Sequence, residues 1–281
     1  METNVSVVTG VTGYTGKYIA KRLLAKGERV RSLTNHLDRE NPFGGQIEMY
    51  PYNFEDKTAL TKSLEGATTL YNTYWVRFSH GQVTYDLAVR NTKILLEAAK
   101  TAGIRKVVHV SIANPDENSP LPYYSGKAAL EKAVKDSGMG YAIVRPTVIF
   151  GAEDILINNI AWLLRKFPVF AVAGSGDYGI QPIFVEDMAD LCVSFAGHQE
   201  NVIADAVGPE KFSFTGLVRL IKKKDAQPRQ DRSRLSRCVA RRFAFGGVVH
   251  RRRYLDSRRD PRADGERPGL FRSADGKYPF Y

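Results

Sequence analysis

A tyrosine and a lysine four positions apart form a pattern suited to proton transfer. If Pro122 begins a helix, Tyr123 and Lys127 lie on one face of it, whereas Tyr124 has only Ala128 at the same spacing. A free phenol has a pKa of about 10 and is a poor acid or base at neutral pH. An adjacent ammonium group stabilises the phenolate and lowers that pKa. We therefore predict that Tyr123 moves a proton and that Lys127 assists it.

Ser111 comes at the end of a predicted buried strand, twelve residues before Tyr123. Its hydroxyl would hold a substrate oxygen by a hydrogen bond while Tyr123 delivers or removes the proton of that oxygen. The alternative is an amphipathic helix with a surface lysine, because the tyrosine and lysine spacing is common by chance. The serine strand upstream favours the catalytic interpretation, in which Ser111, Tyr123 and Lys127 act together.

Three glycines at three-residue spacing separate a β-branched run at 5–9 from a helical pattern. A pyrophosphate must approach backbone N–H groups at a helix N-terminus, where the dipole favours negative charge and a Cβ atom would obstruct contact. Gly10 would permit the turn, Gly13 the approach of the phosphates, and Gly16 the packing of helix on strand. An ordinary turn is the alternative. The position between a strand and a helix favours a dinucleotide site.

The expected cofactor is a nicotinamide dinucleotide, NAD(P), whose ring would exchange a hydride with the substrate. The residues expected to bind it in this part of the chain are Gly10, Thr12, Gly13, Tyr14, Thr15, Gly16 and Asn35. The second strand ends without an acid to hold a ribose 2′-hydroxyl, and Arg31 and Arg39 are close in sequence. A cation would suit the 2′-phosphate, which favours NADP over NAD. The alternative is that these charges are solvated loop residues.

Strands and helices alternate along the chain, and this alternation must position the groups above. After the first strand and helix, we expect strands at 29–34, 46–52, 68–72, 106–112 and 141–145, with helices at 81–101 and 122–136. Such an alternation implies parallel pairing and right-handed crossovers. The predicted fold class is α/β, a doubly wound parallel sheet of Rossmann-like type, with its ligand at the carboxyl ends of the strands.

The positive charge is concentrated in the last 56 residues of the 281. Residues 226–281 carry 14 arginines and one lysine against six acids, a net charge of +9, which leaves +2 for residues 1–225. Nucleic-acid binding by the glycine-rich part is therefore not indicated. Arginine without lysine fits GC-rich codons read in a shifted frame, and helical and strand periodicity vanish there apart from the run at 243–249, so our hypothesis is that this tail is an out-of-frame continuation or disordered. The rival hypothesis is a true basic tail for nucleic acid, a membrane or a partner.

Several other features exclude classes of protein. No run of eighteen apolar residues occurs, and the chain opens directly into its first strand, so we expect no membrane span or cleaved signal. The spacing of Cys192 and Cys238 fits neither a metal site nor a redox motif, which favours reduced thiols and a cytoplasmic location. The histidines show no metal-ligand spacing either, so we expect no metal. The expected partner is a small-molecule substrate, and the oligomeric state stays open.

Taken together, these motifs resemble the short-chain dehydrogenase/reductase superfamily. The closest similarity is to its extended and atypical branch, the NAD-dependent epimerase/dehydratase and NmrA-like proteins, which includes an accessory subunit of respiratory complex I. It covers about residues 3–224. The motifs that carry it are the glycine turn, Ser111, the Tyr123 and Lys127 pair, and the segments Arg145-Pro146-x-x-x-Phe150-Gly151, Gln181-Pro182-Ile183-Phe184-Val185-Glu186-Asp187 and Val207-Gly208-Pro209-Glu210.

The resemblance implies site residues and a domain plan. Ser111, Tyr123 and Lys127 would be the catalytic set, Asn72 and Thr73 would flank the cofactor ribose, and Asn91 would support the active-site hydrogen bonds. Asn53 departs from the family, where an acid often lies near the adenine: either Asp56 serves instead, or the contact with the adenine is weaker. The plan is an NAD(P)-binding Rossmann domain at 1–150, a small and incomplete substrate lobe at 151–225, and the tail at 226–281.

The resemblance leaves two functions open. The first is an NAD(P)-dependent oxidoreductase or epimerase/dehydratase that acts on a carbonyl or alcohol through a Tyr, Lys and Ser proton relay. The alternative is a non-catalytic NAD(P)-binding sensor or assembly factor, because atypical relatives can bind a nucleotide without turning anything over. Retention of Ser111, Tyr123 and Lys127 together favours the enzyme.

Overall fold

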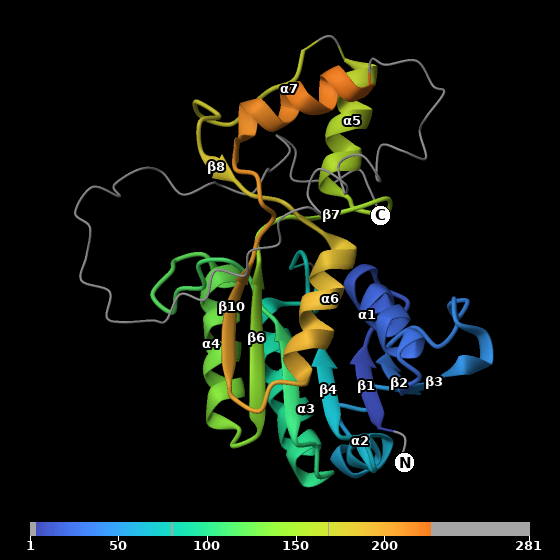
Figure 1. Ribbon diagram of the computed structural model, residues 1–281. Coiled ribbons are helices and arrows are strands. Elements are labelled where there is room, and N and C mark those ends of the chain that lie inside the picture. Colours follow the sequence, from blue (N-terminus) through green and yellow to red (C-terminus); the bar gives the residue numbers. More distant parts are fainter. Residues whose placement is uncertain (1–3, 80, 168, 226–281) are drawn as a thin grey trace.

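A seven-stranded parallel sheet forms the centre of the computed structural model, which describes residues 4–79, 81–167 and 169–225 (Figure 1). The proposed tail at 226–281 lies outside these residues. The strand order is β10-β6-β5-β4-β1-β2-β3. The strands are β1 (Val5–Thr9), β2 (Arg29–Thr34), β3 (Ile47–Pro51), β4 (Thr69–Asn72), β5 (Lys106–Val110), β6 (Gly140–Pro146) and β10 (Val202–Ala206). The predicted doubly wound parallel sheet is confirmed.

The order reverses direction between β1 and β4, which lie side by side at the centre of the sheet. Every residue of β1 is buried, because its β-branched side chains pack against helices on both faces. In an open parallel sheet, the loops that leave two neighbouring strands in opposite directions open a crevice at the carboxyl ends. The glycine turn after β1 and the loop after β4 therefore meet at one place.

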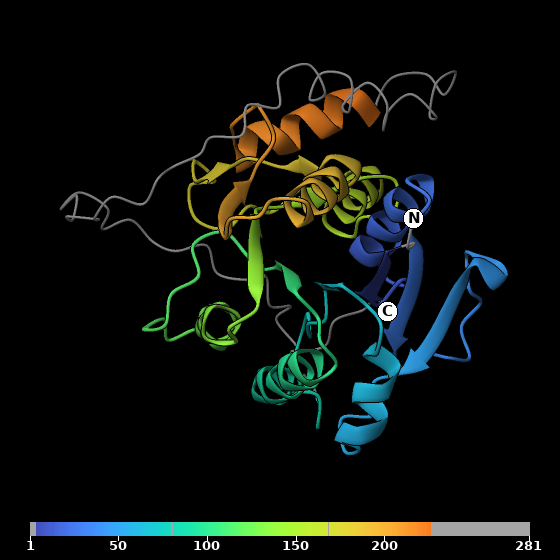
Figure 2. The ribbon, with the colours of Figure 1, turned by 60° about the horizontal axis from the view of Figure 1, so that its bottom comes forward.

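Helices cover both faces of the sheet (Figure 2). One face carries α1 (Tyr14–Ala25) and α6 (Val185–Ala196), and the other carries α2 (Lys57–Leu64), α3 (Tyr85–Thr101) and α4 (Pro122–Asp136). Each layer buries its own apolar cluster: Val8, Ile19 and Met188 belong to the first, and Leu60, Leu95 and Ile143 to the second. Pro122 is the first residue of α4, as predicted, because its fixed φ suits the first helical position.

A small lobe lies beyond the carboxyl ends of the strands (Figure 1). It contains α5 (Leu156–Lys166), α7 (Phe214–Asp225) and a two-stranded sheet of β8 (Gly179–Ile180) and β11 (Phe212–Ser213). Ile160, Phe214 and Val218 form its buried core. A second short pair, β7 (Ile149–Phe150) with β9 (Ile183–Phe184), joins the lobe to the main sheet, and a one-turn 3-10 helix, η1 (Gly44–Gln46), precedes β3.

The segment 151–225 divides between the lobe and the main sheet, which corrects the domain plan predicted from the sequence. After β9 the chain returns to pack α6 on α1, and β10 then pairs with β6 in parallel from Val202 to Ala206. Only afterwards does the chain re-enter the lobe through β11 and α7. The physical reason is the exposed edge of β6, which pairing with β10 covers.

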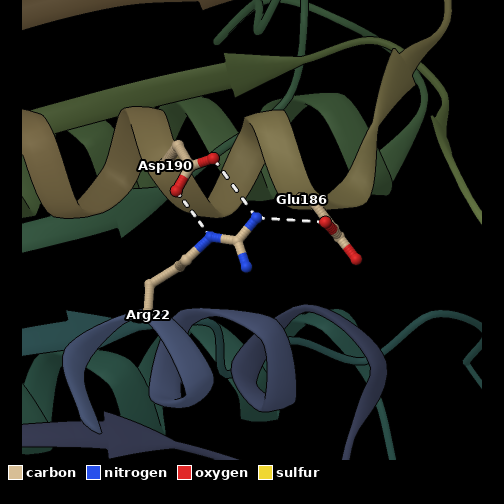
Figure 3. Close-up of polar contacts among 3 residues, drawn as sticks. All are labelled: Arg22, Glu186 and Asp190. Atoms are coloured by element: carbon tan, nitrogen blue, oxygen red, sulfur yellow. Dashed lines mark hydrogen bonds and ion pairs between the residues drawn. The ribbon is translucent and has the colours of Figure 1, made fainter. Parts of the chain in front are cut away.

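Ion pairs join α1 to α6 across the first layer (Figure 3). The Nε of Arg22 lies 2.6 Å from Oδ1 of Asp190, and its Nη2 lies 3.1 Å from Oε2 of Glu186. All three side chains are partly exposed, so water screens the pairs, although the forked contact with Asp190 holds the guanidinium in place.

We expect Arg22→Met to lower the free energy of unfolding by about 1 kcal/mol, because it removes two pairs and leaves two acids adjacent on α6. Urea denaturation at low and high salt measures the free energy of unfolding, and the difference between wild type and variant should shrink in high salt. The matched control is Arg90→Met, which removes a single exposed pair with Glu55 at 3.5 Å and should change nothing measurable. An effect of Arg22→Met no larger than that of the control contradicts the prediction.

In the described ranges, no helix is both long and apolar enough to cross a membrane.

Candidate nucleotide-binding and catalytic site

The turn between β1 and α1 favours glycine at position 10 for its backbone conformation and at position 16 for lack of space. Gly10 has a φ of +69°, which favours glycine, and its carbonyl oxygen accepts a hydrogen bond from Gly13 N at 2.9 Å. A Cβ atom on Gly16 would lie 2.8 Å from the carbonyl carbon of Gly10 and 2.8 Å from the carbonyl oxygen of Thr9. Gly16 therefore allows α1 to pack against the end of β1, as predicted.

The start of α1 fits a bound pyrophosphate. Its N-cap, Gly13, has no side chain to accept a hydrogen bond from the first turn, whereas Asp56 caps α2 and Thr84 caps α3. The N–H groups of the first turn of α1 thus remain available to an anion. Thr12 and Thr15 flank this turn and are half-buried. These residues would hold the diphosphate of a dinucleotide.

The remaining turn residue, Tyr14, extends away from the turn toward the lobe. A Cβ atom on Gly151 would lie 2.7 Å from its hydroxyl oxygen. Burial raises the pKa of the Tyr14 phenol well above its ordinary value, and the negative charge of Asp154 is the second-largest cause of this rise. Among the described residues, its hydroxyl has no hydrogen-bond partner. The side chain of Tyr14 thus links the turn to the entrance of the lobe.

Asn72 and Thr73 lie beside the glycine turn, and their side chains bind other protein groups. Thr73 N donates to Thr9 Oγ1, and Thr73 Oγ1 donates to Thr9 O, each at 2.6 Å. Asn72 is fully buried, with its Nδ2 3.1 Å from Nδ1 of His109 and its Oδ1 accepting from Tyr74 N. Thr73 thus joins the start of the loop after β4 to the end of β1, which stabilises the turn, and Asn72 joins β4 to β5.

His109 is a buried polar residue that the sequence analysis did not select. Because Asn72 Oδ1 accepts from Tyr74 N, its Nδ2 donates to His109 Nδ1, and the ring proton is then on Nε2. Burial, followed by the charge of Lys127, lowers the pKa of His109 well below its ordinary value, so the ring is neutral. In the described part of the chain, Nε2 has no hydrogen-bond partner.

The residues expected to select NADP do not all lie at the cofactor edge. Asn35 and Arg39 are exposed just beyond the carboxyl end of β2. Arg31 instead lies in the middle of β2, opposite Val7, and its Nη1 donates to Glu65 O at 2.7 Å. Glu65 ends α2 ahead of β4, so the guanidinium points to the amino-terminal edge of the sheet. The prediction from sequence that Arg31 lies near the 2′-phosphate of the cofactor is therefore wrong, because the strand directs its side chain to the opposite edge of the sheet.

Position 53 is an asparagine where relatives often have an acid, and Asp56 was expected to lie near the adenine in its place. Asp56 instead caps α2. Its Oδ1 accepts from Ala59 N at 3.0 Å. Asn91, expected to support the active site, is buried in α3 and donates to the hydroxyl of Tyr74 at 3.1 Å. Tyr74 lies on the loop that follows β4, so Asn91 supports that loop.

Lys127 is buried between α4 and β5. Its Nζ donates to Val110 O at 3.0 Å and lies 4.6 Å from the ring centroid of Trp75. A Cβ atom on Gly126 would lie 3.0 Å from Cη2 of Trp75, so a small residue at 126 lets the indole cover the lysine. Burial lowers the pKa of Lys127 to about 7, against the opposing effect of Glu131.

Tyr123 lies in an aromatic cluster with Trp75, Tyr85 and Tyr124. Its ring makes edge contacts with all three at centroid distances of 5.7–5.8 Å. Burial raises the pKa of the Tyr123 phenol to about 12, and Arg77 is the cation that opposes this rise. The sequence predicted the reverse, a pKa lowered by Lys127. The reason for the difference is desolvation, which also leaves Lys127 only partly charged at neutral pH.

A buried ionic network contains Ser111. Its Oγ donates to Oε1 of Glu131 at 2.6 Å, and Arg145 donates to both oxygens of that carboxylate. Arg145 was predicted only as part of a motif, and Glu131 was not predicted. The signal was present, because Glu131 follows Lys127 by four residues on the same face of α4.

The structure thus brings Ser111, Lys127 and Glu131 together, with Trp75 contacting both Lys127 and Tyr123. The glycine turn, the β4 loop and these side chains all lie at the carboxyl ends of β1, β4 and β5. No group of three or more His, Cys, Asp or Glu side chains in the described part of the chain could hold a metal ion.

We expect Lys127→Met to change how stability depends on pH. Between about pH 7 and 10 the unfolded chain holds the lysine proton and the folded chain does not, so wild-type stability should rise with pH in this window. The rise should be on the order of a few kcal/mol and absent from the variant. Urea denaturation at several pH values measures it. The control is Lys132→Met, on the exposed face of α4, which should keep the wild-type slope.

Comparisons with known proteins agree with this fold. A family model for the NAD dependent epimerase/dehydratase family matches residues 6–207. NADH dehydrogenase (ubiquinone) 1 alpha subcomplex subunit 9, mitochondrial, of Rattus norvegicus is 28% identical over 226 residues, covering 77% of this chain and 58% of the relative. Sterol demethylase protein B of Methylococcus capsulatus is 33% identical over 187 residues, covering 58% of this chain and 56% of the relative.

The fold is also that of a solved epimerase. UDP-glucose 4-epimerase of Thermus thermophilus, solved in complex with NAD, superimposes with a TM-score of 0.67 at 17% identity, covering 80% of this chain and 84% of that chain. The matches span little more than half the length of the two curated relatives. The match of the family model over most of the described residues confirms the predicted resemblance: the chain belongs to the NAD-dependent epimerase/dehydratase family.

Proposed function

We propose that this protein binds a nicotinamide dinucleotide and acts as an oxidoreductase or epimerase/dehydratase-like enzyme on a small carbonyl or alcohol substrate. The observation that carries the proposal concerns one edge of the sheet. The uncapped N-terminus of α1, at a turn with no room for a Cβ on Gly16, lies at the same carboxyl edge as Ser111, which follows β5, and as the Lys127 ammonium, which extends from α4 to Val110 O. Membership of the NAD-dependent family supports NAD or NADP as the cofactor.

In this proposal each side chain has a distinct role. The nicotinamide ring, when bound, gives or takes a hydride. Tyr123 holds the proton of the substrate oxygen, because burial keeps its phenol protonated across the neutral range. Lys127 contributes a charge that is half present near pH 7. Ser111 binds the substrate oxygen, and the aromatic cluster of Trp75, Tyr85 and Tyr124 excludes water from Tyr123.

We further propose NADP as the preferred form. Arg39 alone supports this preference, since it is exposed just past the end of β2, where a 2′-phosphate would lie. Arg31, bound to Glu65 at the other edge, does not contribute. Titration of the protein with NADPH and with NADH, with protein fluorescence as the readout, tests the preference. Equal affinity for the two, or an Arg39→Ala variant with an unchanged ratio, contradicts it.

A second candidate function is a non-catalytic nucleotide-binding subunit. Two observations favour it: the high pKa of Tyr123 leaves little phenolate for catalysis, and Trp75 covers Lys127. The relative from Rattus norvegicus is also named as a subunit of a larger assembly.

One experiment separates the two functions. Purified protein is titrated with both cofactors and then screened against a panel of ketones, aldehydes and alcohols by absorbance of the reduced nicotinamide. Turnover of any member supports the enzyme. Micromolar cofactor binding without turnover across the panel supports the non-catalytic subunit. Absence of cofactor binding rejects both.

A further inference from the structure

Glu131 is a buried carboxylate whose hydrogen bonds fix the direction of the Ser111 hydroxyl. The side chain lies on α4, one turn beyond Lys127, and the residue is 2% exposed. Its Oε1 is 2.6 Å from Ser111 Oγ and 2.9 Å from Arg145 Nε, and its Oε2 is 2.5 Å from Arg145 Nη2. Three donors therefore converge on the two oxygens.

The proton in the contact between Ser111 and Glu131 belongs to the serine. A carboxylate held by both arms of a guanidinium is ionised, and an ionised carboxylate only accepts hydrogen bonds. Serine has one O–H and two lone pairs, so once its proton points at Glu131, only lone pairs remain for any other group. Toward a substrate, Ser111 is then an acceptor.

A ketone oxygen and an alcohol oxygen differ in what they can offer such an acceptor. The ketone oxygen has lone pairs only, whereas the alcohol donates through its O–H and accepts at its oxygen. Tyr123, protonated because its phenol is buried, supplies the complementary donor. An alcohol would bind Ser111 with its proton and Tyr123 with its lone pair, while a ketone would bind Tyr123 alone.

We propose that Glu131, anchored by Arg145, is a positioning residue that holds Ser111 as a hydrogen-bond acceptor, so that the site binds its substrate preferentially in the alcohol form. The inference rests on the proposed function. For Ser111 to donate to a ketone, it must turn away from Glu131 and break a short charge-assisted hydrogen bond in a buried environment. Glu131 touches neither substrate nor cofactor and acts only through Ser111.

The first test uses an alcohol and its ketone that the enzyme interconverts in the substrate screen. Binding of the alcohol is titrated in the presence of reduced cofactor and binding of the ketone in the presence of oxidised cofactor, so that no turnover occurs. We expect the ratio of the two dissociation constants to shift at least about tenfold toward the ketone in Glu131→Gln. The glutamine amide can donate to Ser111 Oγ and release the serine proton toward the substrate. The alcohol and the ketone are measured with different forms of the cofactor. Each variant complex is therefore compared with the wild-type complex that holds the same form, so that this difference cancels.

Two variants control this test. Glu131→Asp keeps the carboxylate and should retain most of the wild-type preference, whereas a merely structural role would be damaged by both substitutions. Asp136→Asn neutralises an exposed acid on the same helix, paired with Lys132 at 2.9 Å, and should leave the ratio unchanged. A ratio in Glu131→Gln within twofold of wild type overturns the inference.

The second test needs neither cofactor nor substrate, so it distinguishes failure of the inference from failure of the proposed function. In Ser111→Cys, the ultraviolet absorbance of the thiolate is titrated against pH, and the wild-type titration is subtracted to remove the other cysteines. The adjacent carboxylate should raise the pKa of the new thiol, and adding Glu131→Gln should lower it by at least about one unit. An unchanged thiol pKa overturns the inference. If the thiol pKa shifts but the protein turns over no substrate, the hydrogen bond from Ser111 to Glu131 is supported and the proposed enzymatic function is rejected.

Discussion

Gly16→Ala should reduce the affinity for a dinucleotide at least about 100-fold, which corresponds to roughly 2.7 kcal/mol or more. The added Cβ would lie 2.8 Å from two backbone atoms of the turn, Gly10 C and Thr9 O, and neither can move without displacing the end of β1. The turn would open and the first N–H groups of α1 would lose their common direction. Fluorescence titration with NADPH and NADH measures the loss.

Two further glycine variants show whether the loss comes from the turn or from general unfolding. Gly45→Ala places a Cβ in open space in η1 and should leave binding and stability unchanged. Gly13→Ala meets only the carbonyl oxygen of Gly10, at 3.1 Å, so the fold should persist while the methyl group obstructs the phosphates. Folded Gly13→Ala and Gly16→Ala proteins that bind either cofactor as the wild type does would refute the assignment of this turn.

Tyr123→Phe should lower turnover by 10²- to 10⁴-fold, the usual contribution of a general acid or base, roughly 3 to 5 kcal/mol. The phenylalanine ring keeps the contacts with Trp75 and Tyr85, so the aromatic cluster and cofactor binding should persist. Steady-state kinetics with the substrate found in the screen, together with cofactor titration, measure the two effects separately.

The matched control is Tyr124→Phe, the neighbouring residue on α4. Its ring lies 5.7 Å from that of Tyr123, so the variant tests the loss of a hydroxyl group in the same surroundings. It should reduce turnover by less than about threefold. Equal losses in the two variants would mean that the cluster packs the site without acid chemistry. Full activity in Tyr123→Phe would reject the catalytic role.

The bounds of helices and strands could be predicted from sequence where the residues at their ends have a strong preference for beginning or ending such an element. The strand at 29–34 and the helix at 122–136 were predicted with their bounds, because the strand follows closely after a glycine that ends the preceding helix and the helix begins at a proline. The doubly wound sheet followed from their alternation and is confirmed. The family resemblance is confirmed as well.

The features that sequence analysis missed depend on contacts between distant segments. That β10 joins the main sheet could not be read from its own residues, because its partner, β6, lies about 60 positions earlier. The direction in which Arg31 points depends on the pleat of β2 and on Glu65. The raised pKa of Tyr123 arises from burial among aromatic side chains, and burial is a property of the folded chain. The roles assigned to Ser111, Tyr123 and Lys127 stay predictions.

The passage of the chain through the lobe before it returns to β10 has a consequence for biosynthesis. A ribosome releases the chain from its N-terminus, so β6 emerges complete at Pro146 while the strand that will pair with it ends only at Ala206. During that interval the nascent sheet has an unpaired outer strand, and α1 lacks the helix that will cover its apolar side. We therefore expect a chaperone that binds unpaired strand edges to protect β6 during the interval between the synthesis of β6 and that of β10.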